Sequence, residues 1–329
     1  MIGRRALSLV TGGVLGWTCT VPRRAVAQGA PWVPDRPLRL IVPFAAGGPA
    51  DIFGRLFAEA LSRDLGQPVV VENRTGAGGV VGHEAVAKAV PDGSTVGISG
   101  PGALSIAPAL PRQRMPFDVY RDLTHLSLVV RVPEVVVVNA RSGPRDLASL
   151  IARAKGSPVT YGSAGVGSIT HLASALLASE TGMEATHIPY RGAAPAATDL
   201  LANRFTFMTA DVPVLKPHID SGDLRPVAVT TGDRVPALAA VPTTAELGFP
   251  RVNSDNWYGF AAPPRLPASI RARLEEAARA ALRDQTLIQG FATQGGVAAP
   301  VTGEDYLEFL RSEATKWEPL VKQSGAETL

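Results

Sequence analysis

Short apolar runs alternate with segments of helical periodicity through the first third of the chain. Gly66-Gln67-Pro68 and Pro91-Asp92-Gly93 stand where a helix must end and a strand begin, as glycine and proline commonly do. Strands that alternate with helices predict an α/β fold with a parallel sheet. The expected elements are strands at 38–42, 69–71 and 95–99 and helices at 51–65 and 80–89.

The same alternation returns in the middle of the chain. The apolar segment 126–138 is interrupted by Arg131 and Pro133 and is too long for one ordinary strand, so we expect it to pass from one lobe to a second. Segment 256–260 is expected to lead the chain back from the second lobe to the first. The predicted lobes are 28–130 together with 254–329, and 131–253. Further expected strands are 135–138, 159–162, 187–189, 205–208 and 224–230, with helices at 146–154, 170–179 and 195–201.

The last part of the chain is expected to be entirely helical. Its helices are predicted at 267–283, 287–293 and 304–322, with Thr302 as the N-cap of the last one. A chain of 329 residues exceeds the size of one small core, which agrees with two lobes.

The first thirty residues follow a different pattern. Arg4 and Arg5 precede an apolar run at 6–17, and Ala25-Val26-Ala27 follows it, which is typical of a signal peptide with a small-residue cleavage site. The run is shorter than the roughly 20 apolar residues that span a bilayer. We therefore expect a signal peptide at 1–27, cleavage near Ala27/Gln28, and a soluble periplasmic protein without a transmembrane segment. General secretory and twin-arginine export both stay open.

Removal of that segment changes the charge and the cysteine count. The formal net charge of the whole chain is +3, and it falls to −1 when Arg4, Arg5, Arg23 and Arg24 leave. The single cysteine, Cys19, leaves as well, which excludes disulfides and a thiol nucleophile. The mature part carries no Lys/Arg cluster, so nucleic acid is not expected as a partner.

A glycine-rich turn follows the first strand. Gly47 and Gly48 let backbone amides approach a ligand, and the helix that starts there favours an anion at its N-terminus. Phe44, Ala46 and Asp51 complete this candidate loop. Asp51 fits a helix cap as well as a ligand contact.

The loop after the strand at 159–162 is richer in hydrogen-bond donors. Amides and hydroxyls gather there at a helix N-terminus, and such groups bind a carboxylate without a cation. Ser168 fits a helix cap equally well. His171, one turn into the helix, is expected to pack and to bond the loop rather than act as a general base. The candidate ligand residues are Ser163, Val166, Gly167, Ser168 and His171.

A third candidate cluster is Tyr190-Arg191-Gly192, where a guanidinium suits a carboxylate bidentately and a solvated arginine is the alternative. Gly100 follows the strand at 95–99 and is a further candidate. In open α/β sheets ligands lie at the carboxyl ends of strands, so the loops predict a shared cleft.

Further motifs follow one another along the mature chain: Ile41-Val42-Pro43-Phe44 with Gly47-Gly48 and Asp51, Gly66 to Asn73, Gly76-Ala77-Gly78-Gly79, Pro91-Asp92-Gly93, Gly167-Ser168 with His171-Leu172-Ala173, Pro189-Tyr190-Arg191-Gly192, Leu224 to Thr230, Val241-Pro242-Thr243 with Glu246, and Trp257-Tyr258-Gly259. Through these motifs the chain resembles the receptors of the tripartite tricarboxylate transporters over nearly all of its mature length. That resemblance implies a type II periplasmic-binding-protein fold, in which two α/β lobes joined by two crossovers close on a ligand. It also implies a carboxylate on loop Ser163 to Ser168, with a second polar end reached partly through water by Phe44 to Asp51. Members that bind amino acids show Asp-Asn where this chain has Ala210-Asp211, so an amino acid is not expected, and Asp211 stays a candidate contact.

These features predict a monomeric receptor for a small mono-, di- or tricarboxylate that serves integral membrane transporter subunits, without cofactor or metal. A receptor that presents its closed form to a membrane sensor kinase fits the sequence too. Enzyme interpretations fail on spacing. The glycines at 76–82 miss the dinucleotide fingerprint, Ser163 lacks a glycine two residues earlier, and Ala87 stands where a second zinc histidine would fall after His83.

Overall fold

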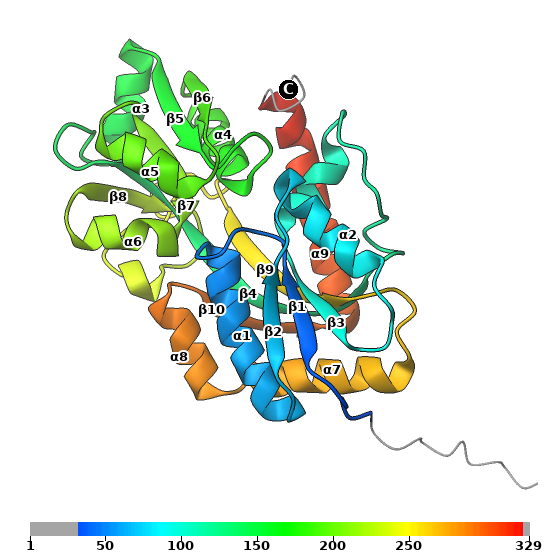
Figure 1. Ribbon diagram of the computed structural model, residues 1–329. Coiled ribbons are helices and arrows are strands. Elements are labelled where there is room, and N and C mark those ends of the chain that lie inside the picture. The colour runs from blue at the N-terminus through cyan, green and yellow to red at the C-terminus, as the bar shows by residue number, and fades with distance from the viewer. Residues whose placement is uncertain (1–31, 325–329) are drawn as a thin grey trace, which may run out of the picture. The chain divides into compact units, whose positions relative to one another are not determined.

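The computed structural model describes residues 32–324, and the expected signal peptide lies outside the described residues. A first group of strands begins with β1 (Leu38–Val42), β2 (Val69–Asn73) and β3 (Thr95–Ser99). These three are parallel in the order β2-β1-β3, and β9 (Asp255–Ala262) continues the sheet antiparallel to β3 (Figure 1). The first predicted strands and their parallel pairing are therefore confirmed.

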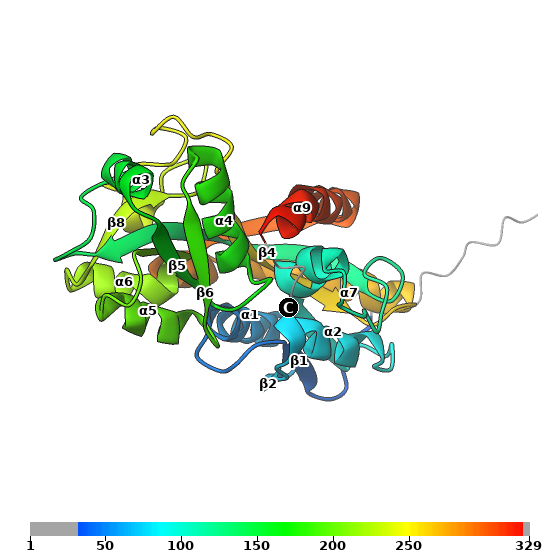
Figure 2. The same ribbon diagram turned by 90° about the horizontal axis from the view of Figure 1, so that it is seen from above.

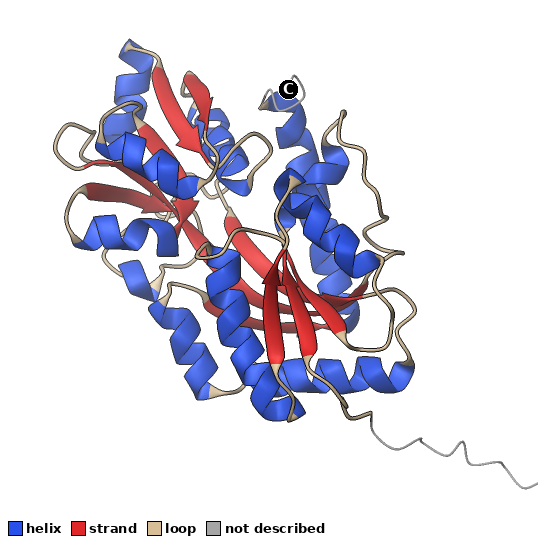
Figure 3. Cartoon of the chain, viewed as in Figure 1, coloured by secondary structure: helices blue, strands red, loops and turns tan. Residues whose placement is uncertain are grey.

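The helices of this group pack on the sheet through apolar faces. Helix α1 (Pro49–Leu65) has proline in its first turn and ends at Gly66, whose φ of 67° is the left-handed conformation that favours glycine. It packs beside α7 (Ala268–Ala281) and α8 (Gln285–Thr293), while α2 (Val80–Ala87) covers β1 and β3. Helices flank the strands throughout (Figure 3). The main core of this group includes Leu40, Phe53, Phe57, Phe260, Leu274 and Phe291.

The long apolar segment is a single strand, β4 (Thr124–Asn139), of 16 residues. Its first half pairs with β9 and β10, and its second half pairs with β7 and β8, so one strand serves both sheets (Figure 1). Register shifts between His125 and Ser127 and between Leu128 and Val130 bend it. The segment thus runs from the first group of strands to the second, and the view that it exceeds one strand was wrong, because a single strand of 16 residues spans it.

The second group of strands has the order β8-β4-β7-β5-β6. Strands β5 to β7 are parallel, as predicted, and β4 is antiparallel to β7 and β8. The elements are α3 (Leu147–Gly156), β5 (Val159–Ser163), α4 (Ile169–Thr181), β6 (Ala185–Pro189), α5 (Ala193–Leu201), β7 (Phe207–Asp211), α6 (Val212–Asp220) and β8 (Leu224–Val229).

The C-terminal part is not entirely helical. Strand β10 (Val297–Thr302) pairs antiparallel with β4 ahead of α9 (Gly303–Gln323). Its only apolar run, Val297-Ala298-Ala299, is too short to signal a strand, and the pairing partner lies far away in sequence. Thr302 is the N-cap residue of α9, as predicted, although its side chain makes no capping hydrogen bond.

Helix α9 joins the two groups through an apolar contact with α4. Trp317 and Val321 of α9 lie in one buried cluster with Ile169 and Leu172 of α4. Figure 2 shows the two helices side by side. Ile106 and Leu110, which follow β3 in the chain, belong to the same cluster.

Candidate functional site

The loop between β5 and α4 is closed by its own hydrogen bonds. Ser168 caps α4, because its Oγ accepts from the His171 amide at 3.2 Å and donates to the Gly165 carbonyl at 2.6 Å. The capping interpretation of Ser168 is thus the one that the structure shows. The amide bonds are Ala164 to Thr170 Oγ1 (2.8 Å), Gly165 to Ser163 Oγ (3.1 Å), Gly167 to His171 Nδ1 (3.2 Å) and Ser168 to the Gly165 carbonyl (3.2 Å).

Three amides near the start of α4 keep their hydrogens available. Within residues 32–324, the amides of Val166, Ile169 and Thr170 donate to no other group. First-turn amides have no partner inside their own helix, and the helix dipole adds to their positive field. An anion at this loop would therefore use these amides rather than that of Gly167, which His171 already occupies.

Two stacked imidazoles support the loop from beneath. The rings of His171 and His187 lie 3.8 Å apart at 12°, and Ser163 Oγ shares a 2.6 Å hydrogen bond with His187 Nε2. Burial, with a contribution from His187, lowers the pKa of His171 to about 3, and burial lowers the pKa of His187 to about 4. Both rings are therefore neutral at neutral pH, and His171 Nδ1 is free to accept the Gly167 amide. His171 packs and bonds the loop as predicted.

Sequence reasoning missed His187. It lies opposite Tyr161 in the parallel register of β5 and β6, and their rings stack at 5.1 Å. The pairing register of β5 with β6 could have identified it. Tyr161 and Ser163 point to the same face of β5, and His187 is the partner of Tyr161 on that face.

The third candidate cluster lies directly against the second. The Tyr190 amide donates to the Ser163 carbonyl at 3.1 Å, and the Gly192 amide donates to the Ala164 carbonyl at 3.2 Å. The Tyr190 hydroxyl donates to Asp199 at 2.9 Å, and burial raises the pKa of Tyr190 to about 12. Arg191 is exposed and has no ion-pair partner within the described part of the chain. The structure thus places the backbone around Arg191 directly against the loop Ser163–Ser168.

The first candidate loop is organised by Asp51. This carboxylate is 4% exposed and accepts from the Gly47 amide at 2.9 Å, from Arg55 at 2.9 Å and from Asn73 at 2.8 Å. Burial raises the pKa of Asp51, but these hydrogen bonds outweigh it and hold the pKa below its usual value. Asp51 therefore shapes the loop, while Phe44, Ala46 and Gly48 remain partly exposed or exposed along it.

Asp211 and Gly100 lie near the crossover strands rather than on the loops. Asp211 ends β7, is 6% exposed and accepts from Asn256 Nδ2 at 3.0 Å. The same nitrogen donates to the Tyr258 hydroxyl at 3.1 Å, and a Cβ on Gly100 would lie 3.6 Å from the Tyr258 ring. Asn256 and Tyr258 connect these two candidates.

A cavity of about 630 Å³ lies elsewhere, between α4, α9 and the crossover strands. Arg131, Glu313 and Lys316 line it together with Leu176 and Phe309. None of the predicted ligand residues lines this cavity. The cavity is therefore separate from the candidate loops.

Comparison with known proteins identifies the family. Residues 53–326 match the family described as tripartite tricarboxylate transporter family receptor. The chain belongs to this receptor family. Protein BugT of Bordetella pertussis is 36% identical to the receptor over 310 residues, which cover 92% of this chain and 94% of BugT.

Two similar solved structures contain carboxylates. R. palustris Rpa4515 with adipate is 33% identical, with a TM-score of 0.82 over 89% of the receptor and 98% of that chain. MatC from Rhodopseudomonas palustris with bound malate is 27% identical, with a TM-score of 0.77 over 88% and 99%. Other similar structures are a periplasmic transporter and a periplasmic binding protein, which confirms the predicted type II fold.

The family and fold are those of solute-binding receptors. Among residues 32–324, no helix is both long and apolar enough to cross a membrane. The predicted motifs, from Pro91-Asp92-Gly93 to Trp257-Tyr258-Gly259, lie inside the matched range. Which residues bind the solute, and where the two lobes divide, stay predictions.

Proposed function

We propose that this protein is a periplasmic receptor that binds a small carboxylate and delivers it to the membrane subunits of a tripartite tricarboxylate-type transporter. The observation that carries the proposal is the loop Ser163–Ser168, which is fixed by its own hydrogen bonds at the N-terminus of α4. The amides of Val166, Ile169 and Thr170 donate to no acceptor within the described residues, and the exposed Arg191 follows β6 next to the loop. A carboxylate matches both kinds of group.

The relatives support the same class of ligand. The similar chains Rpa4515 and MatC hold adipate and malate, which are both dicarboxylates. We propose a mono-, di- or tricarboxylate without an obligatory amino group, because Ala210 stands in place of an acidic residue and Asp211 is already bonded to Asn256. We propose that two lobes close on the carboxylate. These lobes are 28–130 with 254–329, and 131–253, and they meet along β4 and β9.

A thermal-shift panel tests the proposal. We expect at least one of adipate, malate and citrate to stabilise the mature protein by about 2.7 kcal/mol at roughly 100 times its dissociation constant. For a chain of this size that is a rise in Tm of roughly 4–5 °C. Glucose and aspartate serve as a neutral and an amino-acid comparison. A shift with glucose or aspartate and none with adipate, malate or citrate contradicts the proposed ligand class.

The proposed location rests on the sequence of the first 27 residues. We expect the exported protein to begin near Gln28 and to be monomeric, so intact-mass analysis and light scattering of the periplasmic fraction give one mature mass. Full-length protein in the cytoplasm alone would contradict the location.

A further inference from the structure

Three carboxyl groups are buried where the crossover strands meet. Glu134 of β4 is 0% exposed, Asp255 at the start of β9 is 2% exposed, and Asp211 at the end of β7 is 6% exposed. Glu134 is the register partner of Asp211, and the residue before it, Pro133, is the partner of Asp255. Register partners in antiparallel strands have Cβ atoms about 4.5–5.5 Å apart, so Glu134 and Asp211 are close neighbours. Successive side chains alternate between faces, so Asp255 lies on the opposite face of β4, where it binds Arg131.

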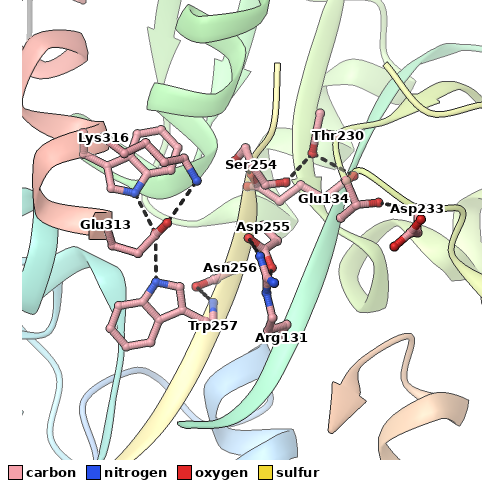
Figure 4. Close-up of polar contacts among 12 residues, drawn as sticks. Arg131, Glu134, Thr230, Asp233, Ser254, Asp255, Asn256, Trp257, Glu313 and Lys316 are labelled. Carbon is pink, nitrogen blue, oxygen red and sulfur yellow. Dashed lines mark hydrogen bonds and ion pairs between the residues drawn. The ribbon is translucent and has the colours of Figure 1, made fainter. Parts of the chain in front are cut away.

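The cations at this junction are already paired. Arg131 of β4 binds both carboxylate oxygens of Asp255, and Lys316 of α9 lies 3.1 Å from Glu313 (Figure 4). Glu313 also accepts from the indole nitrogens of Trp257 and Trp317. Neither cation is bonded to Glu134 or Asp211.

Glu134 and Asp211 each keep one bare oxygen. Glu134 Oε2 accepts from the Ser254 hydroxyl (Figure 4), and Asp211 Oδ2 accepts from Asn256. Within residues 32–324, Glu134 Oε1 and Asp211 Oδ1 are buried without a hydrogen-bond partner. The Tyr258 hydroxyl accepts from the same Asn256 nitrogen.

Two neighbouring buried carboxyls without a cation resist full ionisation. Burying one charged carboxylate without a partner is costly, and two like charges side by side raise the cost further. Burial raises the pKa of Glu134 to about 8, with Asp211 adding to the shift, and burial raises the pKa of Asp211 to about 7. The pair therefore titrates as a unit.

We propose that Glu134 is a positioning residue of this receptor: together with Asp211 it holds at least one proton at neutral pH, and that proton keeps the end of β7 in place. Asp211 is the last residue of β7 and the N-cap residue of α6. In open α/β sheets the ligand binds at the carboxyl ends of the strands, so loss of this proton should also weaken ligand binding. That effect on affinity rests on the proposed function. The effect on stability does not need a ligand.

The direction of the pH effect follows from the raised pKa values. The unfolded chain loses these protons near the ordinary values of 4.5 and 3.8, whereas the native pair keeps them until pH 7 to 8. The stabilisation is fully present below about pH 4, declines as the pH rises from about 4 to about 8, and is absent above that range. In that window the folding equilibrium constant falls by up to about tenfold per pH unit for each proton concerned.

Glu134→Gln supplies the hydrogen permanently and tests the proposal without ligand. We expect its Tm to rise relative to wild type as the pH increases from 5 to 8 and the difference to level off above pH 8. Buried histidines are common to both proteins and cancel in the comparison. Glu276→Gln removes the same charge from an exposed position on α7 and should follow wild type at every pH. A constant difference between Glu134→Gln and wild type from pH 5 to 9 overturns the proposal.

Infrared spectroscopy gives a readout that does not depend on the stability of a variant. Wild-type protein at pH 7 should show the C=O stretch of a protonated carboxyl, which disappears by pH 9 and is weaker in Glu134→Gln. Absence of that band from wild type overturns the proposal. With adipate as the probe, wild-type affinity should fall severalfold between pH 7 and 9, and the affinity of Glu134→Gln should not. If adipate binds neither protein, the proposed function is in question, while the Tm and infrared results still decide the role of Glu134.

Discussion

Replacing Glu313 with alanine is expected to lower the free energy of unfolding by about 3–5 kcal/mol. Its side chain is 6% exposed, and Oε2 accepts from the indole nitrogens of Trp257 and Trp317, each at 3.0 Å. Oε1 accepts from Lys316, whose Nζ lies 4.5 Å from the centre of the Trp317 ring. Removal of the carboxylate leaves two buried N–H donors unpaired and removes the hydrogen bond that connects α9 to β9.

The measurement is chemical denaturation of the ligand-free protein, and in a thermal melt the Tm should fall by roughly 5–8 °C. Glu318→Ala is the matched control, because it lies on the same helix and pairs with Lys322 but is 58% exposed. An exposed pair contributes little, so this control should stay within about 0.5 kcal/mol of wild type. Equal losses in the two variants would show that Glu313 does not connect α9 to the crossover.

The sequence predicted the strands and helices well where one element follows another locally. The strand Leu38–Val42 and the strand Thr95–Ser99 have the predicted bounds, because glycine and proline mark their ends. Helix α6 escaped prediction, since Pro213 and Pro217 stand inside it and proline usually excludes a helix interior. Strand β10 escaped because only its pairing with β4, far away in the chain, makes it a strand.

The candidate site was predicted as a set of loops, and its internal bonding was not. A sequence gives the residue types at a strand end but not which amides are already used. Asp51 and Ser168 both proved to hold their own loops, through the Gly47 amide and the His171 amide. The buried pair of Glu134 and Asp211 depends on the register of β4 with β7, which no local pattern reveals.

Replacing Gly167 with valine is expected to reduce the affinity for the carboxylate by at least about a hundredfold, or roughly 3 kcal/mol. The φ of Gly167 is +70°, a conformation that a β-branched residue adopts only with strain. A Cβ there would lie 3.1 Å from Leu110 Cδ1, and the Gly167 amide would lose its bond to His171 as the loop shifts. The amide of Val166 and the start of α4 move with it.

Calorimetric titration with whichever of adipate, malate and citrate gives the largest thermal shift measures this loss. Gly182→Val is the matched control: Gly182 ends the same helix with a φ of +67°, and no atom lies within 4 Å of its Cβ position. It should cost stability through the same backbone strain and leave affinity unchanged. Leu110→Ala combined with Gly167→Val should recover part of the affinity, because the crowding is relieved while the strain stays.

Arg191→Ala should weaken binding by no more than about fivefold, since an exposed guanidinium contributes about 1 kcal/mol or less. If Arg191→Ala abolishes binding while Gly167→Val binds normally, the carboxylate is held by the guanidinium, and the amides at the start of α4 are not its site.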